Sequence, residues 1–327
     1  KKAQLICQQR SRLMPPKNVK KHHSAKNPYR NRQKANANRN LINSRKDQND
    51  TSKRGSHQEQ IATFRDKITP KPPQNGYFIW GRHAVFAALA NPERRIHQIY
   101  AVAESTDDLE RMLGDLDSQR KAELPHAQMI DRTRLDAIGG VNEKTVHQGI
   151  AAAVWPLKPP HFDVFLDNVK NMLDRRNPIT VRLLLLDQIS DPRNLGAIMR
   201  SAQAFGVTGV ITTFRNAANE NGVLARAASG ALDHVPLVRV VNLARAIEQI
   251  RYHGFFVAGL AGDGNTEVSS LGSHNHLAII LGAEGSGLRR LSRKNCDMLF
   301  RINIDSDTDS LNVSSAAAIA LYAARQE

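Results

Sequence analysis

The sequence LGAEGSGL at residues 281–288 follows an apolar, strand-like run, and the sequence SLNVSS at residues 310–315 leads into an alanine-rich helix. Both stretches combine glycine with small polar residues, so a small ligand can approach their backbone groups closely. A third stretch, DPRNLGAIMR at residues 191–200, follows the apolar residues 181–186. In open α/β sheets, ligands bind where strands end and helices begin. The three stretches therefore predict a shared binding site.

Strand-like and helix-like patterns alternate from residue 179 onward. Apolar strand-like runs are predicted at 181–186, 207–212, 235–240, 255–260, 277–281 and 299–304. Helices are predicted at 194–205, 221–229, 313–325 and after Asn242, which is expected to cap a helix that ends at Gly254. This alternation predicts an α/β fold with a mostly parallel sheet that helices cover on both faces.

The preceding part of the chain has the pattern of a smaller α/β domain. Helices are predicted at 81–89, 107–116 and 132–138, and strands at 96–102, 128–130 and 150–154. Prolines then break this pattern, and a further helix is predicted over 163–176. We therefore expect four segments: a disordered tail (1–72), a small α/β domain (73–156), a linker helix (157–179) and a second α/β domain (180–327).

The first 72 residues hold the whole charge excess of the chain. They contain 19 Lys and Arg against 4 Asp and Glu, and the formal net charge of the whole chain is +15. Few large apolar residues accompany these charges, so the tail is predicted to be disordered. A basic arm of this kind is expected to bind a polyanion, most often nucleic acid. A solvated tail without a partner and a mitochondrial targeting segment are the alternatives.

The cysteine count and the lengths of the apolar runs argue against a disulfide-rich protein and against a membrane-spanning protein. The two cysteines, Cys7 and Cys296, allow no disulfide framework and no CxxC metal site, which is typical of a reducing compartment. No apolar run approaches the ~18 residues that span a bilayer. We expect a cytoplasmic bacterial protein without a membrane segment or a metal, and a mitochondrial matrix protein is the alternative.

Asn194 and Arg200 are the candidate functional residues of the first stretch. Asn194 would present its amide near the start of a helix, and Arg200 follows Gly196 by four residues, so Arg200 and Gly196 share a helix face. A glycine beneath an arginine leaves room for a ligand or for another backbone. The alternative is a surface arginine with an ordinary capping asparagine.

The turn at 282–287 has its glycines in the order Gly-x-x-Gly-x-Gly. A phosphate-binding P-loop would end in Gly-Lys-Ser/Thr, and a dinucleotide-binding turn would read Gly-x-Gly-x-x-Gly, so both are excluded. A tight turn without a ligand is the alternative, but it leaves unexplained why Glu284 stands beside an apolar strand end.

The third stretch precedes a helix that is small and apolar almost all round, which is typical of a buried helix. Asn312 or Ser314 is expected to cap this helix, whose first N–H groups attract electron-rich ligands. A capped core helix without a ligand is the alternative.

In order and spacing, the three stretches resemble the motifs of the SpoU/TrmH family (SPOUT superfamily) of S-adenosylmethionine-dependent RNA ribose 2′-O-methyltransferases. The first motif is similar to 194–200, the second to 281–288, and the third to Ile302 with 310–321. The resemblance covers residues 180–325, and residues 77–155 resemble the family's small L30e-like RNA-binding domain. Within the family, the chain is most similar to the bacterial enzymes that methylate a guanosine of 23S ribosomal RNA.

The resemblance implies a trefoil knot in the C-terminal domain, a homodimer, and a bent S-adenosylmethionine held mainly by backbone groups. It implies no metal. The implied cofactor-binding residues are Leu281, Gly282, Gly285, Ile302, Leu311 and Ser314. The implied catalytic residues are Arg200, Asn194, Glu284 and Asn312.

The implied reaction methylates a ribose 2′-hydroxyl, which must lose its proton during the attack. Arg200 matches the arginine to which the family assigns this role. Because an arginine pKa is above about 12, our hypothesis is that Arg200 holds the adjacent phosphate and orients the hydroxyl, while a phosphate oxygen or water accepts the proton. Asn194 and Glu284 are expected to orient Arg200 and the nucleotide, and Asn312 and Ser314 to complete the pocket. A tRNA ribose methyltransferase and a non-catalytic RNA- or ribosome-binding protein are the alternatives.

Overall fold

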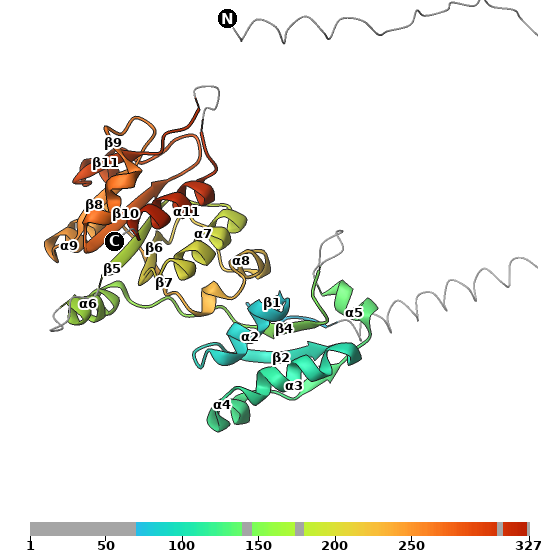
Figure 1. The fold of residues 1–327 in the computed structure, drawn as a ribbon. Helices are drawn as coiled ribbons and strands as arrows, with labels where there is room; N and C mark the ends of the chain where they lie inside the picture. Colours follow the sequence, from blue (N-terminus) through green and yellow to red (C-terminus); the bar gives the residue numbers. More distant parts are fainter. Residues whose placement is uncertain (1–69, 139–145, 174–179, 306–309, 326–327) are drawn as a thin grey trace, which may run out of the picture. The chain divides into compact units, whose positions relative to one another are not determined.

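The computed structural model describes residues 70–138, 146–173, 180–305 and 310–325, which form two β-sheets and their helices (Figure 1). These residues belong to one compact unit, Ile68–Glu327. None of the described helices is long and apolar enough to cross a membrane. The predicted disordered tail lies outside the described residues, apart from its last few positions.

The first sheet has four strands in the order β1-β4-β2-β3. β4 pairs antiparallel with β1 and β2, and β2 pairs parallel with β3. The sequence pattern predicted neither β1 nor α4. The helices and strands of this part are β1 (Tyr77–Trp80), α2 (Arg82–Ala90), β2 (Ile96–Ala101), α3 (Thr106–Gly114), α4 (Ser118–Glu123), β3 (Ala127–Met129), α5 (Arg132–Ala137) and β4 (Ile150–Val154), with a short 3-10 helix at Ala103–Ser105.

The second sheet has seven strands in the order β7-β6-β5-β10-β8-β11-β9, and all neighbours are parallel. The predicted parallel α/β fold is therefore confirmed. Helix α6 (Phe162–Leu173) precedes this sheet. The sheet's own elements are β5 (Val181–Asp187), α7 (Pro192–Ala204), β6 (Gly209–Thr213), α8 (Gly222–Ala228), β7 (Leu237–Val240), α9 (Leu243–Tyr252), β8 (Phe256–Leu260), β9 (Thr266–Glu267), β10 (His276–Gly282), α10 (Arg290–Lys294), β11 (Met298–Arg301) and α11 (Val313–Ala324), with 3-10 helices at Ala231–Asp233 and Val268–Ser273.

Helices pack on both faces of this second sheet, and successive strand residues point to opposite faces (Figure 1). Leu184 and Leu186 of β5 belong to the hydrophobic cluster that contains α7, α8 and α11. Leu183 and Leu185 belong to the cluster that contains α6 and α9. All four leucines are 0% exposed. Burial on both faces explains why β5 is a continuous apolar run rather than an alternating one.

Side-chain caps set where two helices of the second sheet begin. Asn242 accepts a hydrogen bond from the backbone nitrogen of Arg245 at 3.2 Å, which confirms the predicted cap of α9. Helix α7 begins two residues earlier than predicted, because Asp191 caps it and Pro192 occupies its first turn. Asn194 therefore lies within the first turn, and its interpretation as a capping residue is wrong.

A buried ion cluster around Arg94 joins segments that are more than 100 residues apart in sequence. The Arg94 side chain is fully buried, and its Nε and Nη1 donate to Asp233 at 2.7 Å and Glu220 at 2.5 Å. The hydroxyl of Tyr77 also donates to Glu220, at 2.6 Å. Burial and the nearby Glu220 carboxylate raise the pKa of Tyr77, so the phenol remains a hydrogen-bond donor. The cluster fixes β1 and the start of β2 to the loops that flank α8.

Replacing Arg94 should destabilise the protein strongly. Arg94→Met would leave the carboxylates of Glu220 and Asp233, which are only 11% and 5% exposed, without their cation. We expect a loss of about 3–5 kcal/mol in the free energy of unfolding, measured by urea denaturation. Arg95→Met is the matched control, because Arg95 is exposed and only lies over the Trp155 ring, and it should cost about 1 kcal/mol or less. Equal losses for the two variants would contradict this account.

Candidate active site

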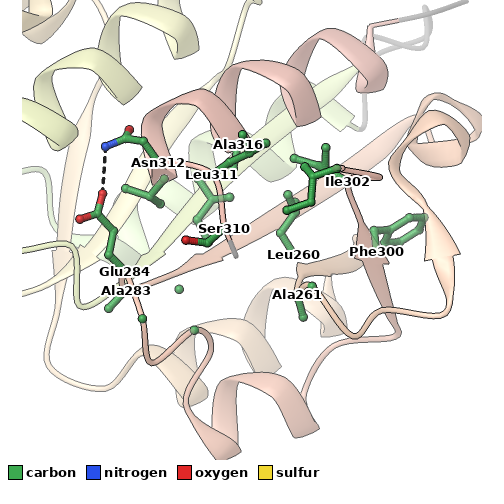
Figure 2. A pocket seen from close by; sticks show the side chains of 17 residues that line it. Leu260, Ala261, Ala283, Glu284, Phe300, Ile302, Ser310, Leu311, Asn312 and Ala316 are labelled. Atoms are coloured by element: carbon green, nitrogen blue, oxygen red, sulfur yellow. Dashed lines mark hydrogen bonds between the residues drawn. The ribbon is translucent and has the colours of Figure 1, made fainter. Parts of the chain in front are cut away.

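A cavity of about 560 Å³ opens at the carboxyl ends of β8, β10 and β11 (Figure 2). The order of the strands reverses beside this cavity, between β5 and β10, because the chain continues from β5 to β6 on one side and from β10 to β11 on the other. Ligands of open α/β sheets bind at such a reversal. The volume is also within the range of small-molecule sites.

Five of the six residues predicted to bind the cofactor line this cavity: Leu281, Gly282, Gly285, Ile302 and Leu311. The sixth, Ser314, does not line it, and its backbone nitrogen donates to Asn312 Oδ1 at 2.9 Å. Strand β11 ends at Arg301 rather than at the predicted residue 304. Ile302 therefore lies on the irregular segment beyond the strand, where Figure 2 places its side chain against the cavity.

The loop from Gly282 to Leu288 is shaped by its glycines. A Cβ on Gly282 would lie 2.1 Å from the carbonyl carbon of Gly287, so Gly282 is required for the loop to fold back on itself. Gly285 and Gly287 have φ angles of 79° and 64°, a left-handed conformation that favours glycine. The backbone nitrogen of Gly287 closes the loop by donating to Ala283 at 2.9 Å. The loop is therefore shaped by its own backbone contacts.

Asn194, Glu284 and Asn312 form a hydrogen-bonded triangle beside the cavity (Figure 2 shows its Glu284–Asn312 side). Glu284 Oε1 accepts from the Asn194 amide at 2.8 Å and from the Asn312 amide at 3.0 Å. The Asn312 amide also donates to Asn194 Oδ1 at 3.1 Å. Asn312 caps α11 through Ser314, so the cap is Asn312 rather than Ser314. The triangle explains the acidic residue in the glycine-rich loop, and it joins the three sequence stretches.

The cavity favours a ligand that is largely apolar and positively charged. Glu284 is the only charged residue among the described residues that line it. Most of the other lining side chains are aliphatic or aromatic, as Leu260, Phe300 and Ile302 show in Figure 2. Apolar walls with a few placed polar groups are typical of cofactor sites.

Arg200 does not line this cavity. It is exposed on α7, six residues after Asn194, which corresponds to a rise of about 9 Å and a rotation of about 240° along the helix. Within the described part of the chain, it forms no hydrogen bond with Asn194, Glu284 or Asn312. The structure thus brings three of the four predicted catalytic residues together and places Arg200 in a second cavity.

Gly196 makes room for a backbone rather than for a ligand. A Cβ at this position would lie 2.5 Å from Ala227 Cβ and 2.6 Å from the carbonyl oxygen of Leu224, both on α8. Of the two possibilities that the sequence left open, the close approach of another chain segment is the one observed. This contact brings α8 directly against α7 on the side where Arg200 lies.

Asp187 and Arg289 are structural partners of the site that the sequence patterns did not indicate. Asp187 ends β5 and is 0% exposed, and it accepts from the backbone nitrogen of Arg289 at 3.1 Å and from its Nε at 2.5 Å. The pair fastens the far end of the glycine loop to the sheet. The sequence does hold one sign of the role of Asp187, since it is an acidic residue directly after the apolar residues 181–186.

Comparison with known proteins identifies the kind of site. The SpoU rRNA Methylase family matches residues 182–322, and the family of RNA 2′-O ribose methyltransferase substrate-binding domains matches residues 78–160. The 23S rRNA (guanosine-2′-O-)-methyltransferase RlmB of Vibrio vulnificus is 37% identical over 247 residues, which are 76% of this chain and 95% of that protein. A Staphylococcus haemolyticus protein assigned to the TrmH family of tRNA/rRNA methyltransferases is 34% identical over 244 residues, covering 75% and 93% of the two chains.

A solved structure shows the same fold. The SpoU methyltransferase AviRb from Streptomyces viridochromogenes, in complex with the cofactor AdoMet, superposes with a TM-score of 0.56 at 22% identity, over 77% of this chain and 90% of that chain. The chain belongs to the SpoU/TrmH family of S-adenosylmethionine-dependent RNA 2′-O-ribose methyltransferases. Among the described residues, no group of three His, Cys, Asp or Glu side chains lies close enough to hold a metal ion.

Loosening the Asp187–Arg289 pair should weaken cofactor binding. Asp187→Asn keeps the size of the side chain but removes the charge that accepts both Arg289 hydrogen bonds. We expect the Kd for S-adenosylmethionine, measured by calorimetry, to rise about tenfold or more. Asp167→Asn is the control, since Asp167 is exposed on α6. A Kd within twofold of wild type for Asp187→Asn would show that the pair does not hold the loop in its binding shape.

Proposed function

We propose that this protein transfers the methyl group of S-adenosylmethionine to the ribose 2′-hydroxyl of a guanosine in 23S ribosomal RNA, as a homodimer in the bacterial cytoplasm. The observation that carries the proposal is the cavity at the carboxyl ends of β8, β10 and β11, with Asn194, Glu284 and Asn312 hydrogen-bonded beside it. The similarity to a 23S rRNA guanosine methyltransferase over nearly its full length supports the choice of substrate.

The residues of the cavity fit S-adenosylmethionine. The aliphatic side chains of Leu281, Ile302 and Leu311 suit an adenine ring, and the Glu284 carboxylate suits the positive charge of the cofactor. When bound, S-adenosylmethionine supplies a methyl group that is activated by attachment to a sulfonium sulfur. The shaped loop 282–288 would hold it through backbone groups.

The chain's own residues would position the RNA hydroxyl for transfer. A bond forms between the 2′-oxygen and the methyl carbon while the bond from that carbon to sulfur breaks, and the hydroxyl proton leaves to a phosphate oxygen or water. Arg200 would hold the phosphate next to the ribose, since its guanidinium stays protonated and cannot accept the proton. The amides of Asn194 and Asn312 are held in fixed orientation by Glu284, and they would orient the nucleoside.

Methyl transfer to defined RNAs tests this proposal. The full chain is incubated with methyl-tritiated S-adenosylmethionine and with unmodified transcripts of 23S rRNA or of tRNA. We expect incorporation into 23S rRNA alone, at a guanosine whose 2′-O-methyl group blocks alkaline cleavage. Incorporation into tRNA alone would favour the alternative function, a tRNA ribose methyltransferase. The similarity to a TrmH-family tRNA/rRNA methyltransferase is the reason to test tRNA as well. Cofactor binding without transfer to either RNA would favour the non-catalytic binding protein.

A face of α7 and α11 supports the proposed homodimer. Ile319 and Tyr322 of α11 are 38% and 61% exposed, and the Tyr322 ring packs edge-on against Phe205 at the end of α7, with ring centroids 6.2 Å apart. Exposed apolar side chains that gather on one face are typical of a protein contact. Light scattering on the purified chain should give twice the 36.3 kDa mass of one chain.

A further inference from the structure

A second cavity of about 310 Å³ lies where the first sheet's segments meet α7 and α8. It shares no lining residue with the cofactor cavity. It is lined by Arg200 of α7, by Arg226 of α8 and by Ser229 just after α8. Trp80 at the end of β1 and Gln148 shortly before β4 line its other side. Its lining among the described residues includes two guanidinium groups and no carboxylate. A cavity of this composition attracts an anion.

The close approach of α7 and α8 at Gly196 brings these cations together. Arg200 lies one turn beyond Gly196 on α7, and Arg226 and Ser229 lie near the end of α8. Arg226 Nη1 donates to the backbone oxygen of Val146 at 2.6 Å, and both residues line the cavity. Within the described part, Arg200 has no ion-pair partner, so its charge is available to a ligand.

Two of the five non-glycine residues with a positive φ angle in the described part of the chain line this cavity. Ser229 has φ 50° and Gln148 has φ 54°, although neither is a glycine. The left-handed conformation disfavours residues with a Cβ, and such residues are often found at ligand sites. Ser229 follows α8 at a position where glycine is the usual residue. Its hydroxyl has no hydrogen-bond partner among the described residues, so the fold alone does not explain the serine.

The side of the cavity formed by β1 and the residues before β4 offers a side-chain amide to a nucleoside. Trp80 lines this side of the cavity and is 8% exposed, so most of its ring is packed inside the protein. Gln148 accepts from the backbone nitrogen of Arg82 through Oε1 at 3.0 Å, which leaves its amide N–H groups for a ligand. A side-chain amide can donate to the polar edge of a base.

We infer that this second cavity binds a nucleotide of the RNA substrate that neighbours the methylated one, an inference that rests on the proposed function. Arg200 and Arg226 hold its phosphodiester from two sides, and the Ser229 hydroxyl donates to the same phosphate. Trp80 and Gln148 contact the attached nucleoside. Residues of the first sheet are then part of the substrate site, together with α7 and α8. The bound phosphate lies beside Arg200.

Two variants and a control test this inference in the full chain. Ser229→Gly removes the hydroxyl but places glycine where the backbone favours it, so the melting temperature should be unchanged or higher. Arg226→Ala removes one phosphate cation. For both, kcat/KM for the 23S rRNA transcript should fall at least about tenfold, as expected for a lost hydrogen bond to a charged group. Arg245→Ala removes an exposed arginine of α9, on the opposite face of the sheet, and should stay within twofold.

The outcomes separate this inference from the proposed function. S-adenosylmethionine should bind all three variants with a Kd within twofold of wild type. If wild type transfers methyl groups to 23S rRNA but Ser229→Gly and Arg226→Ala do so within twofold, the second cavity is not a substrate site. The same conclusion follows if the loss of activity comes with a lower melting temperature or weaker cofactor binding. If wild type binds the cofactor but methylates neither 23S rRNA nor tRNA, the proposed function itself fails.

Discussion

Arg200→Ala should lower the single-turnover rate of methyl transfer at least about 10²-fold, with an unchanged Kd for S-adenosylmethionine. The magnitude follows from losing one charged donor that is positioned for the reacting group. Cofactor affinity should be preserved because Arg200 lies outside the cofactor cavity and makes no hydrogen bond to Asn194, Glu284 or Asn312 within the described part. Rates are measured with saturating RNA, so a loss of RNA affinity does not mask the effect.

Arg200→Lys distinguishes an arginine that holds the phosphate from one that accepts the hydroxyl proton. A lysine keeps the charge but not the planar fork that holds a phosphate through two hydrogen bonds. We expect its rate to lie between those of wild type and Arg200→Ala, with a pH dependence of the same shape as wild type, because the residue positions the phosphate and does not accept the proton. Arg245→Ala is the control for the loss of a surface arginine. An Arg200→Ala rate within twofold of wild type, with cofactor binding intact, would contradict the assignment.

Removing residues 1–72 should flatten the salt dependence of RNA binding. The tail carries 19 Lys and Arg, and the rest of the chain has equal numbers of basic and acidic residues, 27 of each. If about six tail cations meet phosphates, the affinity of the full chain should fall roughly 10³-fold between 50 and 200 mM salt. The truncated chain should lose much less over the same range, because its remaining phosphate contacts are few.

The truncation has its own control. The Kd for S-adenosylmethionine should be the same in the full and truncated chains, since the cofactor cavity is formed by residues 260–316. The affinity for a 23S rRNA transcript is measured by filter binding at five salt concentrations. An unchanged slope of log Kd against log salt concentration would show that the tail does not contact RNA, and the solvated tail would then be the better interpretation.

Much of the second sheet could be predicted because its strands are buried on both faces. Continuous apolar runs such as residues 181–186 have few alternatives to a central parallel strand. Asn242 was recognisable as a cap because it directly precedes an amphipathic pattern. The predicted start of α7 at residue 194 is two residues too late, because the prediction does not count Asp191 and Pro192 as helix-starting residues, although both residue types favour the start of a helix.

The triangle beside the cavity was predictable only as a set of candidates. Asn194, Glu284 and Asn312 each stood at a predicted strand end or helix start, and parallel strands place such positions at one edge of the sheet. Sequence spacing could not show that Glu284 accepts from both amides, or that Arg200 faces a different cavity. Those facts depend on the rotation of α7 and on its contact with α8 at Gly196.

The ion pairs of Arg94 and Asp187 could not be predicted from the sequence, because their partners lie far away along the chain. Arg94 and Asp187 each pair with residues more than 100 positions away. Nothing in the sequence near either residue specifies such a partner. The trefoil knot and the domain boundaries at residues 72, 156 and 179 stay predictions, since the resemblance to the family and the composition of the chain are their only support.

The central claim is that this chain methylates a guanosine ribose of 23S ribosomal RNA, and its most direct test is a map of 2′-O-methyl groups in RNA from cells with and without the gene. The account predicts that one guanosine of 23S rRNA loses its 2′-O-methyl group in cells without the gene. It should regain the group with the wild-type gene but not with Arg200→Ala. An unchanged map of 23S rRNA in cells without the gene, or full restoration by Arg200→Ala, would contradict the account.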